Sequence, residues 1–217
     1  MSIAENVRRV KAAIQAHQTG DDVTMIAVTK SVDPDVALAL YEEGIRDFGE
    51  NRPDSLLEKV NAMPEDARFH FIGTLQTRKV RQIIDKVTAI HSLDRLSLAE
   101  EINKRADRVI DCFVQVNISG EASKHGLEKE EVLPFIENCI QYPHIRVIGL
   151  MTMAPLTEND TIIRQTFHEL RLLRDDIKRR DLPHAPCTEL SMGMSNDFNI
   201  AIEEGASFVR IGTILVQ

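Results

Sequence analysis

The sequence predicts an α/β protein: a (β/α)8 barrel of the TIM-barrel class, with an extra helix at its N-terminus. Three observations lead to this prediction. Short apolar runs alternate with amphipathic, helix-like stretches along the 217 residues, as is typical of parallel strands joined by right-handed crossovers. About eight such units in roughly 200 residues fit a small barrel better than an open, doubly wound sheet. No Pro/Gly/Ser-rich linker divides the chain, so we expect one domain over residues 1–217.

The extra helix is expected at about residues 3–17. Ile3, Val7, Val10 and Ile14 recur there at helical spacing, which is typical of a helix with one buried face. The pattern changes after Gly20, where the alternating units begin.

The alternating units follow in order. We expect strands at 23–29, 47–50, 68–72, 89–93, 112–118, 147–151, 188–192 and 207–211. We expect helices between them at 35–43, 53–61, 77–86, 97–105, 129–141, 160–180 and 196–204. Pro34 and Pro53 suit the first turns of two of these helices, and Gly44 and Gly205 suit the ends of two.

Composition and charge exclude several classes of protein. Hydrophobic residues make up 43% and charged residues 28%, the balance of a globular chain rather than a disordered one. The net charge of -8 argues against a nucleic-acid or anionic-membrane binder. No apolar run approaches the ~20 residues that span a bilayer, and the N-terminal stretch is unlike a signal peptide.

The cysteines and histidines favour a cytoplasmic protein without a metal. Cys112, Cys139 and Cys187 are widely spaced and form no CxxC pair, which argues against a disulfide framework or a zinc site. The seven histidines show no HxH or HExxH spacing, so we expect them on the surface or in loops. His91, near a strand end, either lines a pocket or makes a structural hydrogen bond.

Polar residues and glycines gather where the expected strands end, which is the functional face of such a barrel. The last two strands carry the sharpest signal. Ser191, Gly193 and Ser195 lie at the end of one, and Gly212 and Thr213 directly follow the other. Hydroxyls and glycines in these two loops are typical of a phosphate site. They predict a cradle for one phosphate group, with ordinary strand-to-helix turns as the open alternative.

Lys30 is the candidate for covalent chemistry. It follows the apolar run 23–29, and a lysine head in a partly dry barrel mouth loses some of its preference for the charged form. A free amine attacks a carbonyl to form a Schiff base. An aldehyde that bears a phosphate would use Lys30 and the cradle together, and pyridoxal 5′-phosphate (PLP) is such a molecule. The alternative is a lysine that extends to solvent from a strand tip.

Arg210 lies within an apolar run, so we expect its side chain to point into the barrel, where an arginine needs partners. It either pairs with Glu189 or faces the pyridine nitrogen of a bound cofactor. Because arginine only donates hydrogen bonds, the second arrangement would keep that nitrogen unprotonated. The ring would then be a poorer electron sink than one with an aspartate partner.

Eight short stretches of the sequence resemble one family. They are AVTK, FGENR, FHFIGTLQTRKV, IHSLDR, VNISGEASKHGL, GLMTM, LSMGMSNDF and VRIGT, which span nearly the whole chain. The chain resembles the pyridoxal 5′-phosphate homeostasis protein family, whose fold is like the N-terminal barrel of bacterial alanine racemase. It departs from the family at Arg78, where many relatives have Asn, and in residues 214–217, where relatives usually have a Phe-Gly-containing tail.

The resemblance implies a PLP site and no metal or catalytic residue. The residues implied to bind the cofactor are Lys30 (covalent attachment), Ser191, Gly212 and Thr213 (phosphate), Arg210 (pyridine nitrogen), and Asn51 and Met151 (pocket lining). The family is regarded as a carrier and regulator of intracellular PLP that affects amino-acid and keto-acid balance, without an established turnover. PLP-dependent apoenzymes are the candidate acceptors.

Two other functions stay open. A PLP-dependent racemase of weak activity would need a second acid or base opposite Lys30. In alanine racemase this is a tyrosine delivered across a dimer, whereas Tyr41 falls here in an expected helix and Tyr142 in a turn. No residues remain for that enzyme's extra β-domain, so the sequence favours a carrier. The third possibility is a barrel that binds another phosphorylated metabolite without covalent chemistry. No sustained exposed apolar stripe indicates a dimer, and we expect a monomer.

Overall fold

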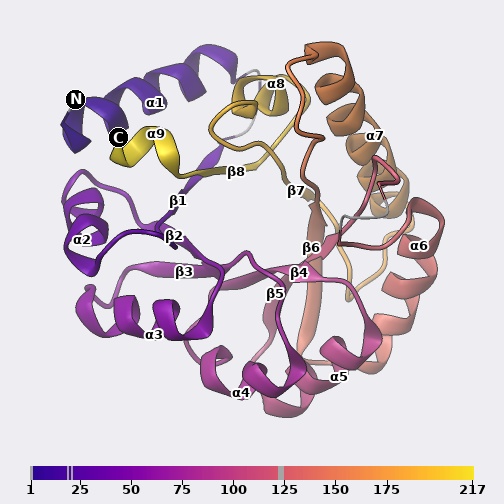
Figure 1. The fold of residues 1–217 in the computed structure, drawn as a ribbon. Coiled ribbons are helices and arrows are strands. Elements are labelled where there is room, and N and C mark those ends of the chain that lie inside the picture. The colour runs from indigo at the N-terminus through magenta and orange to yellow at the C-terminus, as the bar shows by residue number, and fades with distance from the viewer. Residues whose placement is uncertain (1, 19, 21, 122–124) are drawn as a thin grey trace.

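A closed barrel of parallel strands is the framework of the protein (Figure 1). The computed structural model describes residues 2–18, 20, 22–121 and 125–217. The strands follow chain order around the barrel, and the last pairs with the first to close it. They are β1 (Thr24–Val28), β2 (Asp47–Glu50), β3 (Arg68–Phe71), β4 (Ala89–Leu93), β5 (Ile110–Gln115), β6 (Ile145–Met151), β7 (Glu189–Ser191) and β8 (Phe208–Ile211). The predicted (β/α)8 barrel is confirmed.

Helices surround the barrel (Figure 1). They are α1 (Ile3–His17), α2 (Pro34–Glu42), α3 (Pro53–Ala62), α4 (Val80–Ile83), α5 (Leu96–Arg105), α6 (Lys129–Asn138), α7 (Asp160–Lys178), α8 (Phe198–Glu203) and α9 (Thr213–Val216), with 3-10 turns η1 (Thr77–Lys79) and η2 (Cys139–Gln141). The predicted extra helix, α1, packs beside α9. The Asn6 amide donates to the carbonyl oxygens of Leu215 and Gln217, at 3.3 and 2.7 Å. These bonds hold the segment after β8 against α1.

Three elements differ most from the prediction, and most of the others differ from it by one to three residues at an end. The helix expected at 77–86 is a 3-10 turn followed by the short α4. The fifth strand, expected at 112–118, runs from Ile110 to Gln115. A helix, α9, follows β8 where none was expected.

The strands divide the buried side chains between two layers, because neighbouring residues in a strand point to opposite faces. In β3, Phe69 and Phe71 belong to the large apolar cluster that also takes in the helices. His70, between them, contacts the ring of Phe208 from β8. Phe113 from β5 also meets Phe208, with 5.3 Å between ring centroids. Since β3 and β5 are not neighbours of β8, these rings meet across the barrel interior.

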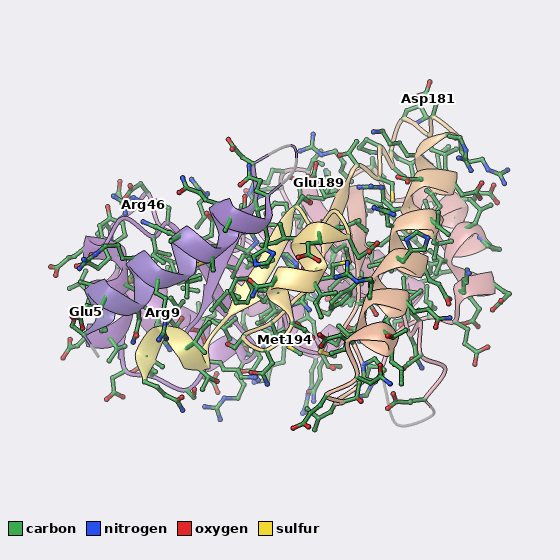
Figure 2. The ribbon with its side chains drawn as sticks, turned by 90° about the horizontal axis from the view of Figure 1, so that it is seen from above. Glu5, Arg9, Arg46, Asp181, Glu189 and Met194 are labelled. Carbon is green, nitrogen blue, oxygen red and sulfur yellow. The ribbon has the colours of Figure 1, made fainter. Side chains whose placement is uncertain are left out.

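All the C-terminal ends of the strands lie at one end of the barrel. Seen from the side, Glu189 at the start of β7 and Met194 beyond its end lie toward opposite edges (Figure 2). The strands are parallel, so all their C-terminal ends lie on the side of Met194. The β7–β8 edge has the single register pair Ser191–Phe208, whereas β5 pairs with β6 all along its length.

In the described part of the chain, no helix combines the length and apolar character that crossing a membrane requires.

Candidate functional site

A cavity of about 1040 Å³ opens where the strands end. Its lining residues lie at or after the C-terminal ends of β1, β2, β3, β5, β6, β7 and β8. Active and binding sites of such barrels are built at this end, and a large concave pocket is the default location for a small-molecule site. The cavity is therefore the candidate functional site.

The cavity brings together six of the seven residues that the sequence singled out. They are Lys30, Asn51, Met151, Arg210, Gly212 and Thr213. Lys30 and Thr213 are exposed, whereas Met151 and Arg210 are buried. Pairing of β1 with β8 places residues from the two ends of the sequence side by side, and a Cβ on Gly212 would lie 3.4 Å from Val28.

Lys30 follows β1 by two residues. The sequence suggested a partly dry position at the strand tip, but the side chain is exposed. The backbone before it is fixed: Thr29 N–H donates to the Gly49 carbonyl at 3.1 Å, and Val32 N–H donates to the Thr29 carbonyl at 3.2 Å. Its amine is therefore accessible to a molecule in the cavity.

A buried carboxylate ties together the segments that carry two lining residues. Glu50, fully buried at the end of β2, accepts hydrogen bonds from the hydroxyls of Thr29 and Ser55, at 2.6 and 2.7 Å. The ammonium of Lys59, buried in α3, lies 3.2 Å from the same carboxylate. Thr29 and Glu50 each directly precede a lining residue, so this network sets the relative position of the β1 and β2 loops.

The loop after β7 reaches the end of β8. Gly193 has a φ of +94°, and a Cβ on it would lie 2.6 Å from an alanine Cβ in α8, so this position requires glycine. The Asp197 carboxylate accepts the Met194 N–H at 2.6 Å, and α8 begins at the next residue rather than at 196. Ser195 Oγ accepts the Gly212 N–H at 3.3 Å. Burial raises the pKa of Asp197, against the lowering effect of the Met194 N–H and of nearby positive charge.

Ser191 is not part of the lining. Its side chain is fully buried, and its Oγ accepts a hydrogen bond from Arg210 Nη1 at 2.6 Å and lies 2.8 Å from His91 Nδ1. The expectation that Ser191 holds a phosphate does not fit this position, because its hydroxyl is already engaged inside the barrel. Ser195 is the serine of the same loop that lines the cavity.

Arg210 is 5% exposed and points into the barrel, as expected. Its Nη2 donates to the carbonyl of Thr152 at 2.9 Å, and its Nη1 donates to Ser191. These oxygens, and not the carboxylate of Glu189, are its hydrogen-bond partners. Burial lowers the pKa of Arg210 to about 10, and the charge of Asp197 opposes this effect. The guanidinium is thus still charged at pH 7.

Two histidines correct the expectation that histidines lie on the surface or in loops. His70 and His91 are buried in the barrel, with their rings 5.1 Å apart between centroids. Of the two roles considered for His91, the structural hydrogen bond is the one observed.

Other lining residues were missed in the sequence. Gln115, which donates to the carbonyl of His125 at 3.4 Å, and Asp197 also line the cavity. Gln115 is the last residue of β5, but the strand was expected to continue to 118, which concealed its place at the strand end. Within the motif VNISGEASKHGL, residues 122–124 lie outside the described residues.

Comparison with known proteins fits this architecture. The family model for the N-terminal domain of alanine racemase matches residues 1–217. A pyridoxal phosphate homeostasis protein of Aquifex aeolicus (strain VF5) is 42% identical to this chain, over 99% of the chain and 97% of that protein. The chain belongs to the pyridoxal phosphate homeostasis protein family. A second protein of this family, from Pseudomonas aeruginosa, is 35% identical over 99% of this chain and 94% of its own length.

Solved structures agree with the assignment to the pyridoxal phosphate homeostasis family. PipY of Synechococcus elongatus, determined with PLP bound, has a TM-score of 0.88 and 29% identity and is matched over 100% of both chains. Alanine racemase of Corynebacterium glutamicum has a TM-score of 0.76 and 17% identity, over 98% of this chain and 59% of the enzyme. This second likeness concerns the fold alone.

Proposed function

We propose that this member of the pyridoxal phosphate homeostasis family binds PLP in the cavity and carries it in the cell. The observation that supports this proposal most directly is that one cavity holds an accessible primary amine, on Lys30, together with the hydrogen-bond donors of the β7 and β8 loops. The likeness of the whole chain to PipY, which was solved with PLP bound, also supports it.

The residues of the cavity suit the chemistry of PLP. Bound PLP supplies an electrophilic aldehyde and an electron-withdrawing ring, and its phosphate needs hydrogen-bond donors. Lys30 offers the amine for the aldehyde. Ser195 and Thr213 offer hydroxyl groups on the β7 and β8 side, and Gly212, whose N–H donates to Ser195 Oγ at 3.3 Å, lies beside them. We propose Ser195, in place of Ser191, as the serine that contacts the phosphate.

We propose that PLP is attached covalently, as a Schiff base on Lys30 Nζ. The amine nitrogen bonds to the aldehyde carbon, and the aldehyde oxygen leaves as water. Arg210 is proposed to face the pyridine nitrogen and to keep it unprotonated, because a guanidinium only donates hydrogen bonds. Asn51 and Met151 are proposed to line the sides of the site.

A ring held in this way withdraws electrons less strongly than one whose nitrogen is protonated. We propose that residues 1–217 form one PLP-binding domain that acts as a monomer, supplies PLP-dependent apoenzymes and thereby affects amino-acid and keto-acid balance. A cytoplasmic location is part of the proposal. The three cysteines are buried free thiols, which suits a reducing compartment.

The racemase alternative has no observation in its favour. Tyr41 donates a hydrogen bond to Asp66 at 2.5 Å, outside the barrel, and Tyr142 follows η2. Within the described residues, the lining of the cavity contains no tyrosine.

Absorbance and mass measurements on the purified protein test the proposal. The protein is incubated with PLP, and the peptide masses are compared before and after borohydride reduction. We expect an absorbance band in the visible or near-ultraviolet and a reduced adduct on the peptide that contains Lys30. Lys30→Ala should lose both.

Lys104→Ala is the matched control, because Lys104 is exposed on α5 and outside the cavity; it should keep the adduct. PLP retained by the unaltered protein without a reducible adduct would reject the Schiff base. No binding of PLP would reject the proposed function, and turnover of L- to D-amino acids that is lost in Lys30→Ala would favour the racemase.

A further inference from the structure

Five side chains form a continuous hydrogen-bonded chain through the barrel interior. Asp47 Oδ1 lies 2.9 Å from His70 Nε2, and His70 Nδ1 lies 3.0 Å from His91 Nε2. His91 Nδ1 lies 2.8 Å from Ser191 Oγ, which accepts from Arg210 Nη1 at 2.6 Å. The chain starts at the N-terminal end of β2 and reaches the cavity through Arg210.

The charged groups at the two ends of this hydrogen-bonded chain determine which group donates in each hydrogen bond. Burial alone would raise the pKa of Asp47, but hydrogen bonds from Arg68 and His70 outweigh it and lower this pKa to about 2. At neutral pH Asp47 is therefore a carboxylate, which only accepts hydrogen bonds, whereas Arg210 only donates them. Each group between them has to accept on the Arg210 side and donate on the Asp47 side.

This requirement assigns a proton to each middle group. Ser191 accepts from Arg210 and donates its O–H to His91 Nδ1. His91 carries its proton on Nε2 and donates it to His70 Nδ1. His70 also carries its proton on Nε2 and donates it to Asp47. Both imidazoles are then neutral, and each uses one nitrogen as donor and the other as acceptor.

The opposite direction of these hydrogen bonds, and a further proton on either imidazole, are both unfavourable. If His91 carried a proton on Nδ1, Ser191 Oγ would receive two donors, and its own O–H would lose its acceptor in a fully buried position. A second proton on the imidazole pair would also add a positive charge close to Arg210. Burial is the main cause that lowers the pKa of His91 well below its usual value, and the charge of Arg210 acts in the same direction.

The surroundings of the chain are apolar. Phe113 stacks on His91 with 4.2 Å between ring centroids, and Phe208 contacts both imidazoles. Groups in such a setting depend on one another for hydrogen bonds, because an unpaired buried polar group is costly.

We propose that Asp47, His70, His91 and Ser191 form a one-way hydrogen-bonded chain that fixes the guanidinium of Arg210 at the cavity. His70 and His91 are thus positioning residues, although neither lines the cavity. Ser191 and the Thr152 carbonyl each take one N–H of Arg210. A guanidinium has further N–H groups, which stay available to a molecule in the cavity. Only the effect on bound PLP rests on the proposed function; the proton order concerns the protein alone.

The first test needs no substitution. Nitrogen-15 NMR of the histidine-labelled protein, without PLP and at pH 7, reports which ring nitrogen carries the proton. His70 and His91 are identified by their contacts with the Phe113 and Phe208 rings. We expect both to carry it on Nε2 alone. A proton on Nδ1 of His91, or two protons on either ring, overturns the proposal.

The second test removes one link. Ser191→Ala should abolish the slowly exchanging Nη resonances of an arginine-labelled sample that belong to Arg210. Phe113→Leu, which loses packing beside His91 but no hydrogen bond, should keep them. If Ser191→Ala retains the slowly exchanging Nη resonances of Arg210, or if Phe113→Leu loses them equally, the proposal is overturned.

The third test uses PLP. Ser191→Ala should bind PLP roughly tenfold more weakly, the scale of one charge-assisted hydrogen bond, and with a shifted absorbance maximum, while the reducible adduct on Lys30 persists. Unchanged affinity and spectrum in Ser191→Ala would overturn the positioning role. If the unaltered protein does not bind PLP, the proposed function fails, and the two NMR tests still decide on the chain.

Discussion

Two buried charges adjoin the cavity, and the protein balances them in different ways. Glu50 is in contact with its counter-charge, because the ammonium of Lys59 lies 3.2 Å from its carboxylate and two hydroxyls complete its hydrogen bonds. Arg210 donates to neutral oxygens, and its hydrogen-bonded chain reaches a carboxylate only at Asp47.

We expect the difference to follow from the proposed role of each charge. Lys59 balances the charge of Glu50 by direct contact, which suits a residue that holds two loops together. The longer chain orients Arg210 but leaves part of its guanidinium free to face the cavity. On the proposed function, the buried charge that faces the ligand is held by a hydrogen-bonded chain of neutral groups, whereas Glu50, which supports two loops, is in direct contact with its counter-charge.

Breaking the contact pair should have the largest effect. Lys59→Met leaves the carboxylate of Glu50 buried without its counter-charge, and we expect the free energy of unfolding to fall by ~3–5 kcal/mol. Urea unfolding followed by circular dichroism measures this. The double variant Glu50→Gln/Lys59→Met removes both charges and keeps an oxygen acceptor for one of the two hydroxyls, so it should recover part of the loss. A loss below ~1 kcal/mol in the single variant would contradict the role of the pair.

Removing the charge of Asp47, at the far end of the hydrogen-bonded chain, should lower the free energy of unfolding by a smaller amount that depends on pH. The pKa of Asp47 is lowered from 3.8 to about 2 in the folded protein, so its contribution is fully present above pH ~4 and is lost as the pH falls through ~2. Asp47→Asn keeps an oxygen acceptor for His70 and should cost about 2 kcal/mol at pH 7.

Urea unfolding at several pH values between 7 and 2 checks this expectation. The gap between the unaltered protein and Asp47→Asn should close as the pH falls from ~4 to ~2. A gap of constant size over that range would show that the charge of Asp47 is not its source.

Breaking an ion pair on the surface should have the smallest effect on the free energy of unfolding, and it provides a reference for the buried pair. Arg105 Nε lies 2.7 Å from Glu101 Oε1 on α5, with side chains 40% and 23% exposed. Arg105→Gln should change the free energy of unfolding by no more than ~0.5 kcal/mol, because water screens such pairs. A loss comparable with that of Lys59→Met would mean that pairing itself, and not burial, sets the cost.

The barrel could be predicted from the sequence because its signal is repeated along the chain. Two strands, β2 and β4, have the predicted bounds, and the others begin or end within about three residues of them. The missed helix, α9, has four residues, too few for helical periodicity to be visible. The helix expected at 77–86 has apolar residues at suitable spacing, but its first turn is 3-10.

The candidate site could be predicted only in part. Asn51 and Gly212 directly follow strands and Lys30 follows one by two residues, and these positions are visible in the sequence. Ser191 and Ser195 stand in one motif, and the structure separates them because β7 ends at Ser191, with its side chain inside the barrel.

The inward direction of the His70 side chain is predictable from the sequence. His70 lies between two phenylalanines in β3, so alternation along the strand places it on the face opposite to theirs, which is the barrel interior. The hydrogen bonds between strands could not be inferred, because they depend on the register of strands distant in sequence.

The single register pair between β7 and β8 has a consequence for how the barrel opens. Local opening begins where contacts are fewest, and this edge is the sparsest in the sheet. The loops that carry Ser195 and Gly212 flank the same edge, where Gly212 N–H donates to Ser195 Oγ at 3.3 Å and Arg210 N–H donates to the Gly193 carbonyl at 2.9 Å. A ligand that contacts both loops binds the closed barrel and not the open one, so its binding free energy adds to the stability of the seam. If PLP contacts both loops, as proposed, we expect occupancy of the cavity and integrity of the β7–β8 edge to be thermodynamically linked.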